Sequence, residues 1–311
     1  MLGDGGIETD LIFHHGLDLP HFASFVLLGS DDGRQALRGY YLDYLQIAQE
    51  SRVGIVLESA TWRANPDWGE LLGYGSDGLS TANRAAVDLL VALRDQADPD
   101  VGPIIISGCV GPRIDGYDPV TAVTETEAQA YHAAQVEVFA ESAADLVTAI
   151  TMAYPAEAVG IVRAAQAAGI PVVVSFTVET DGRLPDGTAL RDAIQVVDQA
   201  TGTGAAYFMV NCAHPSHLVG TFDPVSDATG SPDWVTRIRG LRLNASARSH
   251  TELDAAEDLD EGDPKAFGAG YARLRAELPH LTVLGGCCGT DHRHIREVAK
   301  ACLGAVSRAV E

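Results

Sequence analysis

The chain has 311 residues, 46% of them hydrophobic, so it can bury the core of one large α/β domain or of two smaller ones. Its 43 acidic and 21 basic residues give a formal net charge of −22, which repels the phosphates of nucleic acids and excludes them as partners. Because it has neither a run of about 18 apolar residues nor the basic start and long apolar core of a secretory signal, we expect no membrane partner.

Short apolar, β-branched runs alternate with longer helical patterns rich in Ala and Leu, which indicates parallel strands each followed by a helix. The expected strands are Met1-Leu2 leading into Asp4, Val53–Leu57, Pro103–Ser107, Asp145–Ala149, Pro171–Phe176, Ala205–Val210, Leu241–Asn244 and Thr282–Gly285. The expected helices are Arg34–Ser51, Leu79–Gln96, Glu125–Ser142, Ala156–Ala168, Ala189–Thr201, Pro232–Arg239, Pro264–Leu278 and Arg293–Ala309. Eight such units predict a (β/α)8 TIM barrel that forms a single domain over residues 1–311.

A doubly wound sheet also alternates strands with helices, but its sequence signals are missing. The glycines of Gly3-x-Gly5-Gly6 lack the G-x-G-x-x-G spacing of a dinucleotide site. The segment Gly108–Gly111 lacks the lysine of a phosphate-binding loop. The most polar segment, Glu252–Asp263, is expected to be a solvated loop before the seventh helix.

Three cysteines follow the expected strands. Cys212 comes after the sixth strand, and the adjacent Cys287 and Cys288 come after the eighth, between glycines. The carboxyl ends of barrel strands share one face, so we expect these thiols to converge although they are far apart in the chain. Three sulfur ligands leave one tetrahedral position of a zinc ion open, as in a catalytic site. The chain is therefore expected to bind one Zn²⁺ through Cys212, Cys287 and Cys288.

Three other interpretations compete with the open zinc site. A disulfide framework is disfavoured, because five cysteines in 311 residues is a low and odd number. A buried thiol pair without a function would leave the flanking glycines unexplained. A closed structural zinc site would take His214 as its fourth ligand. We favour the open site, and because thiolate ligands suit a reducing compartment we expect the protein to be cytoplasmic.

Several motifs together resemble the homocysteine S-methyltransferase family over nearly the whole chain. The cysteine motif Gly286–Thr290 is the most specific of them. The others are Asp4–Leu11 at the start, Leu57–Thr61 with Trp62 and Ala64-Asn65 after the second strand, Ser107–Pro112 after the third, Val174–Val178 in the fifth, and Val210-Asn211-Cys212 after the sixth.

The resemblance implies an enzyme that moves a methyl group from a sulfonium or betaine-type donor, S-methylmethionine above all, to the thiol of homocysteine, giving methionine. Zinc on the three cysteines would accept the substrate thiol as fourth ligand and favour its deprotonation. A thiol in water has a pKa of about 8.5, so coordination would supply thiolate at neutral pH. A cobalamin-carrying domain is not part of this chain.

The resemblance also implies which residues bind the substrate. Asp4 would pair with the substrate amine through a charge-assisted hydrogen bond. Ser59 and Thr61 would hydrogen-bond the amino-acid carboxylate, and Asn211 and Asn244 would contribute donors in or just behind the pocket.

One position departs from the family. Relatives carry a Phe-Glu-Thr-like triplet after the fourth strand, and its glutamate approaches the amine of homocysteine, whereas this chain has Ile150 there. Either Glu58 or Glu179 replaces that carboxylate, or the acceptor is a different small thiol. A catalytically silent zinc-binding barrel is a third alternative.

Other polar and aromatic residues near the expected strand ends have simpler interpretations. Trp62 offers a ring face for a cationic donor, but packing at the barrel rim is favoured. His292 and His294 lie two residues apart at the start of the last helix, where we expect solvent contacts. Cys109 is expected to line the pocket, and Cys302 to pack in the core.

Overall fold

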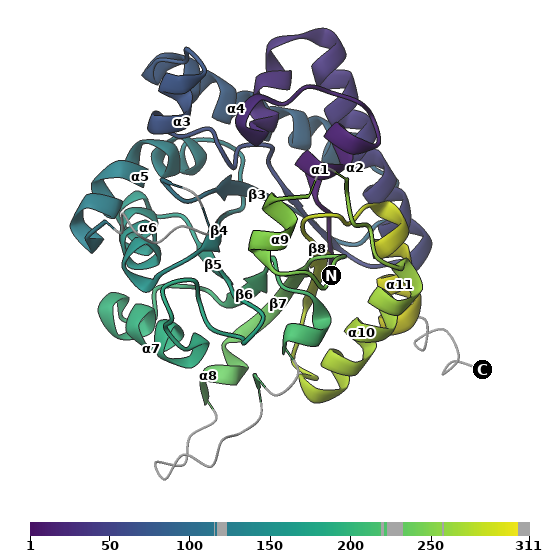
Figure 1. Ribbon diagram of the computed structural model, residues 1–311. Helices are drawn as coiled ribbons and strands as arrows, with labels where there is room; N and C mark the ends of the chain where they lie inside the picture. The colour runs from purple at the N-terminus through teal and green to yellow at the C-terminus, as the bar shows by residue number, and fades with distance from the viewer. Residues whose placement is uncertain (115, 117–122, 219–220, 223–232, 257, 304–311) are drawn as a thin grey trace.

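The computed structural model describes residues 1–114, 116, 123–218, 221–222, 233–256 and 258–303. In these ranges eight parallel strands pair in chain order, and β1 also pairs with β8, so the barrel is closed (Figure 1). This confirms the predicted (β/α)8 barrel. The strands are β1 (Leu2–Gly3), β2 (Ile55–Glu58), β3 (Ile104–Val110), β4 (Leu146–Met152), β5 (Val172–Thr177), β6 (Phe208–Asn211), β7 (Ile238–Leu243) and β8 (Val283–Gly286).

The helices surround the strands, with α5, α6 and α7 on one side of the barrel and α10, α11 and α2 on the other (Figure 1). The helices of the outer ring are α2 (Asp31–Ser51), α4 (Ser76–Gln96), α5 (Glu125–Ala140), α6 (Pro155–Ala168), α7 (Leu190–Thr201), α8 (Asp233–Thr236), α10 (Pro264–Glu277) and α11 (His292–Leu303). None of the helices in the described ranges has the length and the apolar character that crossing a membrane requires.

Local sequence explains where several helices begin and end. Ser30 caps α2 by accepting a hydrogen bond from the Gly33 N–H at 3.0 Å. Thr124 and Glu127 form a reciprocal capping box at the start of α5. Gly169 ends α6 with φ +75°, a left-handed conformation that glycine adopts without steric cost.

The barrel interior changes from apolar to polar along the strands. Val56, Val173, Met209 and Val283 form one buried apolar cluster inside the barrel. Side chains alternate between the two faces of a strand, so the next inward residue lies two positions further on. On β2, β5 and β6 this position holds Glu58, Ser175 and Asn211, all buried. On β7, Arg242 is also buried and lies two residues beyond Gly240. The apolar layer closes the barrel, and the polar layer forms the base of the site above it.

Three expectations about the elements were wrong or incomplete. The helix expected over Pro232–Arg239 is a single turn in the described part, α8, because the chain already enters strand β7 at Ile238. Residues 304–309 of the expected last helix lie outside the described residues. The segment Glu252–Asp263 is not all loop, because Ser249 and Glu252 form a capping box that starts α9 (His250–Asp254).

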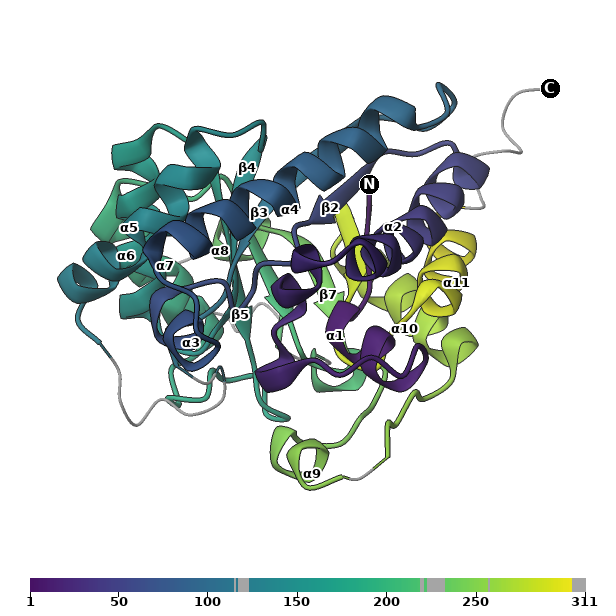
Figure 2. The ribbon, with the colours of Figure 1, turned by 90° about the horizontal axis from the view of Figure 1, so that it is seen from above.

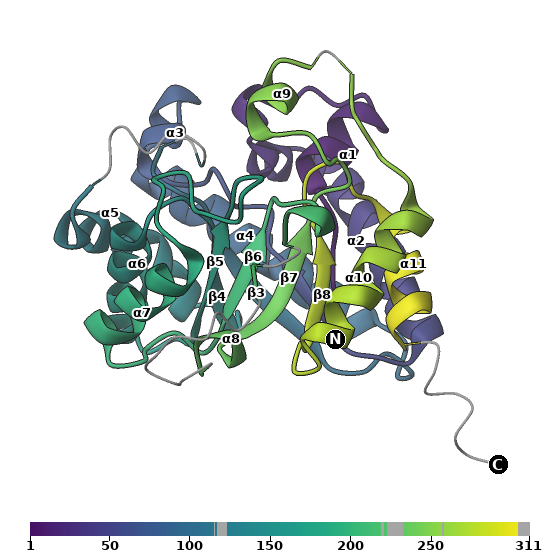
Figure 3. The same cartoon turned by 60° about the horizontal axis from the view of Figure 1, so that its bottom comes forward.

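Two short helices missing from the sequence prediction lie at the carboxyl end of the barrel. The helix α1 (Ile7–Phe13) follows β1 directly, and α9 comes from the long connection between β7 and α10. Figures 2 and 3 both place α1 and α9 at the same end of the barrel, beside the upper strand ends in Figure 3. A third, α3 (Pro66–Leu71), follows β2 and is capped by Asn65. Of these additions, α1 and α9 supply walls of the site.

Candidate active site

The three thiols converge because their strands flank β7. The N–H of Cys212 donates to the Arg242 carbonyl of β7 at 3.1 Å, and the N–H of Cys287 donates to the Leu243 carbonyl at 2.8 Å. The Sγ atom of Cys212 lies 2.7 Å from Sγ of Cys287 and 3.9 Å from Sγ of Cys288. We call these three residues the thiol cluster, and their sulfur atoms all lie within 4.8 Å of one another.

The backbone around the cluster is held in unusual conformations. Cys212 has φ +52°, a left-handed conformation that costs energy for a residue with a side chain. His250 of α9 stabilises this turn, with Nε2 at 2.7 Å from the Cys212 carbonyl oxygen. On β8 the Thr290 hydroxyl donates to the Cys287 carbonyl at 2.7 Å. A Cβ at Gly6 would overlap that same carbonyl, so only glycine lets α1 start this close to the cluster.

Contacts between the sulfur atoms disfavour ionisation of the Cys287 and Cys288 thiols. Contact with the Cys212 sulfur raises the pKa of the Cys287 thiol to about 12, and the same contact raises the pKa of Cys288 well above its ordinary value. A cation that replaced these protons would relieve the crowding. Three soft sulfur donors at this spacing fit Zn²⁺. His214 is not part of the group, and its Nδ1 instead lies 2.7 Å from the Ser216 hydroxyl.

A cavity of about 340 Å³ opens beside the thiol cluster. Its walls come from the start of the chain through α1, the turns after β2 and β4, the segment after β7 and the thiol cluster. The polar lining residues include Asp4, Glu8, Ser59, Glu58, Arg63, Thr151, Arg242, Asn244, Ser246, His250, Asp258 and Asp260, and the apolar ones include Ile7, Phe13, Phe22, Trp62, Ile150, Leu253 and Leu259. The cavity is thus mixed, with charges of both signs.

Asp4 lies in the cavity base, where it is paired with a cation of the protein. The Arg242 guanidinium donates to one carboxylate oxygen of Asp4, and the Glu58 N–H donates to the other at 3.0 Å. Burial raises the pKa of the Asp4 carboxyl, while Arg242 acts in the opposite direction. Both oxygens therefore already have partners before a substrate amine arrives.

Ser59 and Thr61 belong to one hydroxyl chain that joins the ends of β2 and β3. The two hydroxyl oxygens lie 2.7 Å apart, the Thr61 hydroxyl donates to the Cys109 carbonyl at 2.7 Å, and the Cys109 N–H donates to the Ser59 oxygen at 2.9 Å. Ser59 and Cys109 line the cavity. Thr61 is completely buried and is not among the lining residues, so it reaches the cavity only through Ser59.

The two asparagines have different surroundings. Asn211 is buried below the cavity, where its Oδ1 accepts from the Thr151 N–H at 3.0 Å and from the Ser175 hydroxyl at 2.7 Å. It holds Thr151 at φ +64°, where β4 has a register shift. Asn244 lines the cavity, and its Oδ1 is buried without a hydrogen-bond partner among the described residues.

Ile150 lines the cavity from β4 and is only 7% exposed, so this wall is apolar where the family resemblance places a glutamate. Glu179 does not line the cavity, and its carboxylate lies 3.1 Å from His250 Nδ1. The Trp62 ring carries the Arg63 guanidinium at 4.0 Å from its centroid, so the protein itself supplies a cation there. Cys302, partly buried, packs against the core as expected.

Sequence reasoning missed Glu8, Arg63 and His250 in the cavity wall. Glu8 lies inside the opening motif, and its position on the first turn of α1 was the available signal, but α1 itself was not predicted. Arg63 and His250 follow strands by several residues, in turns whose direction depends on packing.

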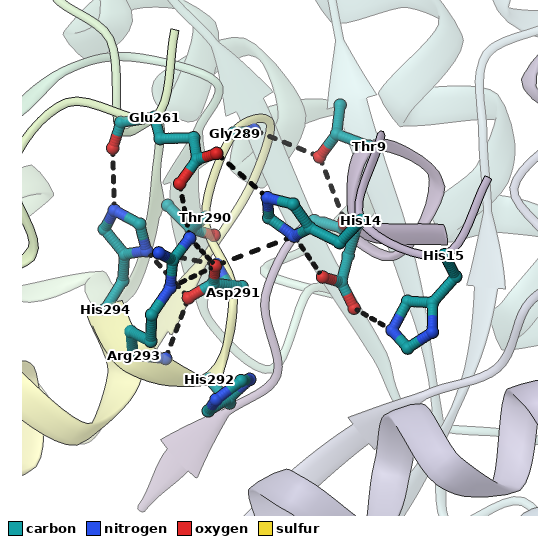
Figure 4. A network of polar contacts seen from close by, with 12 residues as sticks. Thr9, His14, His15, Glu261, Gly289, Thr290, Asp291, His292, Arg293 and His294 are labelled. Atoms are coloured by element: carbon teal, nitrogen blue, oxygen red, sulfur yellow. Dashed lines mark hydrogen bonds and ion pairs between the residues drawn. The ribbon is translucent and has the colours of Figure 1, made fainter. Parts of the chain in front are cut away.

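A second group of possible ligand atoms, Asp10, His14 and Asp291, also lies within 4.8 Å. Figure 4 shows that it is part of a network joining α1, the turn before α11 and Glu261. His14 lies 2.7 Å from Asp10 and 3.1 Å from Glu261, and the Arg293 guanidinium donates to both Asp291 and Glu261. We call Asp10, His14 and Asp291 the carboxylate–histidine cluster.

The network corrects the expectation for His294. This residue is completely buried, with Nδ1 at 3.1 Å from Asp291 and Nε2 at 2.8 Å from the Glu261 carbonyl oxygen. It is held there because the segment after α9 folds back onto the start of α11. His292 is partly exposed, and its Nδ1 lies 3.7 Å from Asp43.

The family model described as homocysteine S-methyltransferase matches residues 1–302. Selenocysteine Se-methyltransferase of Brassica oleracea var. italica is 24% identical, over 96% of this chain and 87% of that relative. Homocysteine S-methyltransferase 4 of Zea mays is also 24% identical, over 96% and 88%. The oxidized crystal form of the homocysteine methyltransferase MmuM from Escherichia coli superposes with a TM-score of 0.75 at 19% identity, over 96% of this chain and 94% of that one. A metallated form of MmuM superposes with a TM-score of 0.71.

Proposed function

Because the chain belongs to the homocysteine S-methyltransferase family, we propose that it is a zinc-dependent enzyme that methylates the thiol of homocysteine, with S-methylmethionine as the favoured donor. The observation that carries the proposal is the thiol cluster beside a cavity at the carboxyl end of the barrel, where such barrels carry their chemistry. A solved structure of the same fold is described as a metallated form, which supports metal binding, and the thiol cluster is the place that we propose for the metal.

Cys212, Cys287 and Cys288 would hold Zn²⁺, which supplies a Lewis acid that favours ionisation of an acceptor thiol when bound. The chain's own residues fix the geometry. His250 and Thr290 hold the two cysteine turns through their carbonyls. Ile7, Ile150 and Leu253 cover the cavity with apolar surface, and exclusion of water strengthens electrostatic interactions inside.

The reaction needs an acceptor thiolate and a cationic donor in line. A lone pair of the acceptor sulfur forms the new bond to the methyl carbon, and the bond from that carbon to the donor sulfonium breaks with its electron pair remaining on the donor. The donor leaves as a neutral thioether. Glu8, Asp258 and Asp260 around the cavity favour a cationic donor over an anionic one.

Apolar Ile150 and the Asp4–Arg242 pair leave the cavity base without a free carboxylate, which favours a second acceptor class, a small thiol without an ammonium group. One relative carries selenocysteine in its name, which supports testing a selenol. We also infer a cytoplasmic location, since three thiols remain ready for metal only in a reducing compartment.

The test is a methyl-transfer assay with S-methylmethionine or betaine as donor and homocysteine or selenocysteine as acceptor, run together with metal analysis. We expect one zinc per chain and methionine formation that stops in Cys287→Ser. Cys302→Ser is the matched control, because Cys302 lies on α11 outside the thiol cluster. A zinc-loaded protein that transfers methyl groups to none of these acceptors would favour the silent barrel.

A further inference from the structure

The carboxylates that line the cavity differ in how much of their hydrogen-bonding capacity the protein already uses. Asp4 is occupied by Arg242 and by the Glu58 N–H. Asp260 accepts from the Ser246 hydroxyl at 2.7 Å and from the Gly262 N–H at 3.2 Å. The Oε2 atom of Glu58 has no partner among the described residues, but it is buried beneath the cavity surface. None of these three offers an accessible, unused oxygen to a cationic ligand.

Glu8 differs from them in exposure and in position. It lies on the first turn of α1, is only partly buried, and lines the cavity. One of its oxygens accepts from the Ser24 hydroxyl at 2.8 Å, which orients the carboxylate. A carboxylate has about four acceptor positions, so capacity for a further donor remains. Glu8 is close to the thiol cluster, because Gly6 packs directly on the Cys287 carbonyl.

Arg63 supplies the opposite charge in the same cavity, from the turn after β2. Its guanidinium lies between two indole rings, 4.0 Å from the centroid of Trp62 and 3.7 Å from that of Trp68. Stacking on both faces fixes the plane of the guanidinium and leaves its edge for hydrogen bonds, one of which goes to the Ile114 carbonyl at 3.2 Å. Both Arg63 and Glu8 line the cavity.

The two charges are within electrostatic reach of each other. Burial raises the pKa of Glu8 to about 7, and the Arg63 guanidinium acts in the opposite direction. A bound ammonium would also favour the ionised form of Glu8. Ile150, which also lines the cavity, offers no charge to a bound ammonium.

We propose that Glu8 and Arg63 form a clamp for the head group of an α-amino acid, with Glu8 binding the ammonium and Arg63 the carboxylate, so that the ligand's sulfur points toward the thiol cluster. This proposal rests on the proposed function and names the substrate class of the same cavity. It moves recognition of the amine from the cavity base to the α1 wall. Asp4 then has a supporting role, in which it neutralises buried Arg242.

The test uses binding of two thioethers to the full-length protein, so that neither methyl transfer nor thiol coordination contributes. Methionine has the complete head group, and 4-(methylthio)butanoate lacks only the ammonium. Calorimetry should give an affinity ratio in favour of methionine of at least about tenfold, since a tenfold ratio corresponds to 1.4 kcal/mol. Glu8→Gln should bring the ratio close to one and leave the affinity for 4-(methylthio)butanoate within about twofold.

Arg63→Gln should weaken both ligands together, because both carry the carboxylate. Asp43→Asn is the matched control, since it removes an exposed carboxylate outside the cavity lining and should leave the ratio unchanged. If Glu8→Gln does not fold, Ser24→Ala tests the same point by releasing the carboxylate from its hydroxyl partner, and the ratio should fall in that variant.

An unchanged ratio in Glu8→Gln, or equal weakening of both ligands, overturns the clamp. The outcome is independent of the proposed function. A protein that prefers methionine through Glu8 but transfers no methyl group retains the clamp and loses the methyltransferase proposal. If the wild type methylates homocysteine but Glu8→Gln binds both thioethers with unchanged affinity, the methyltransferase proposal is retained and the clamp is lost.

Discussion

The thiol cluster and the carboxylate–histidine cluster share one segment, the turn between β8 and α11. The end of β6 adds Cys212 to the thiol cluster, and the segment of α1 and the residue after it add Asp10 and His14 to the other. Each places three possible ligand atoms within 4.8 Å. They differ in what surrounds those atoms. Asp291 accepts from the Arg293 backbone N–H at 2.8 Å and from the Arg293 guanidinium, and lies 3.1 Å from His294. The thiol sulfurs have hydrogen bonds mainly to one another.

The comparison teaches that spacing alone does not make a metal site. In the carboxylate–histidine cluster the protein supplies its own cations, and a metal ion would have to displace the Arg293 guanidinium and a proton of His14. In the thiol cluster the sulfur contacts disfavour ionisation of Cys287 and Cys288, and a soft metal ion would replace thiol protons without displacing a charged side chain. We therefore expect the carboxylate–histidine cluster to stabilise the fold and the thiol cluster to bind metal.

The largest expected difference between the two clusters is in the effect of a substitution on metal binding. Removing a hydrogen-bond partner of a metal ligand typically lowers metal affinity by up to roughly 100-fold. Cys287→Ser removes a ligand itself, so it should lower zinc affinity by more than that. Asp291→Asn should leave zinc affinity unchanged. Competition with a chromophoric chelator measures both. Equal zinc loss in the two variants would mean that the clusters do not differ as described.

The next effect is on stability. The Asp291 side chain is almost completely buried and accepts hydrogen bonds from the Arg293 backbone and guanidinium. Asp291→Asn removes the charge that Arg293 and His14 face, and because Arg293 is about half exposed this should cost about 2 kcal/mol, within the range for a hydrogen bond to a charged group. Urea unfolding monitored by circular dichroism measures the change in free energy. A loss below about 1 kcal/mol would contradict the structural role.

A smaller effect depends on pH. Burial opposes protonation of His14, but hydrogen bonds to Asp10 and Glu261 prevail and raise its pKa above the ordinary value. Its contribution to stability is therefore complete below the unfolded pKa of about 6.5 and is lost as pH rises through the raised folded pKa. Hydrogen bonds to His14 and Arg293 lower the pKa of Glu261, which stays ionised over this range.

The measurement compares the unfolding free energies of the wild type and His14→Gln between pH 6 and pH 9. The difference should be largest at pH 6 and should shrink toward pH 9. A constant difference would show that His14 contributes packing or neutral hydrogen bonds and no charge.

The smallest effect is expected at His15, which is mostly exposed and whose Nε2 lies 3.7 Å from Asp10. His15→Gln should change the unfolding free energy by less than about 0.5 kcal/mol, the usual range for surface substitutions. The same urea titration applies. A change as large as that of His14→Gln would mean that the network extends further along α1 than its contacts indicate.

The accuracy of the sequence predictions varied between regions for physical reasons. Strands such as β5, with Val172–Thr177 buried throughout, are continuous apolar runs whose pattern depends on local composition. The start of β7 was placed too late, because Arg239 interrupts the apolar pattern of Ile238–Leu243. The helices α1, α3 and α9 were missed because each is shorter than two turns or close to it, and short helices depend on tertiary contacts.

The sequence by itself determined the barrel, the family and the convergence of Cys212, Cys287 and Cys288, because strand order places the carboxyl ends of β6 and β8 on one face of the barrel. Only the tertiary structure decided which charges reach the cavity. Asp4 became the partner of Arg242, Arg63 covered Trp62, and Glu8 was left at the cavity wall, although these residues come from separate segments. Electrostatic pairing depends on distances of a few ångströms between segments, and those distances are established only when the helices pack around the closed barrel.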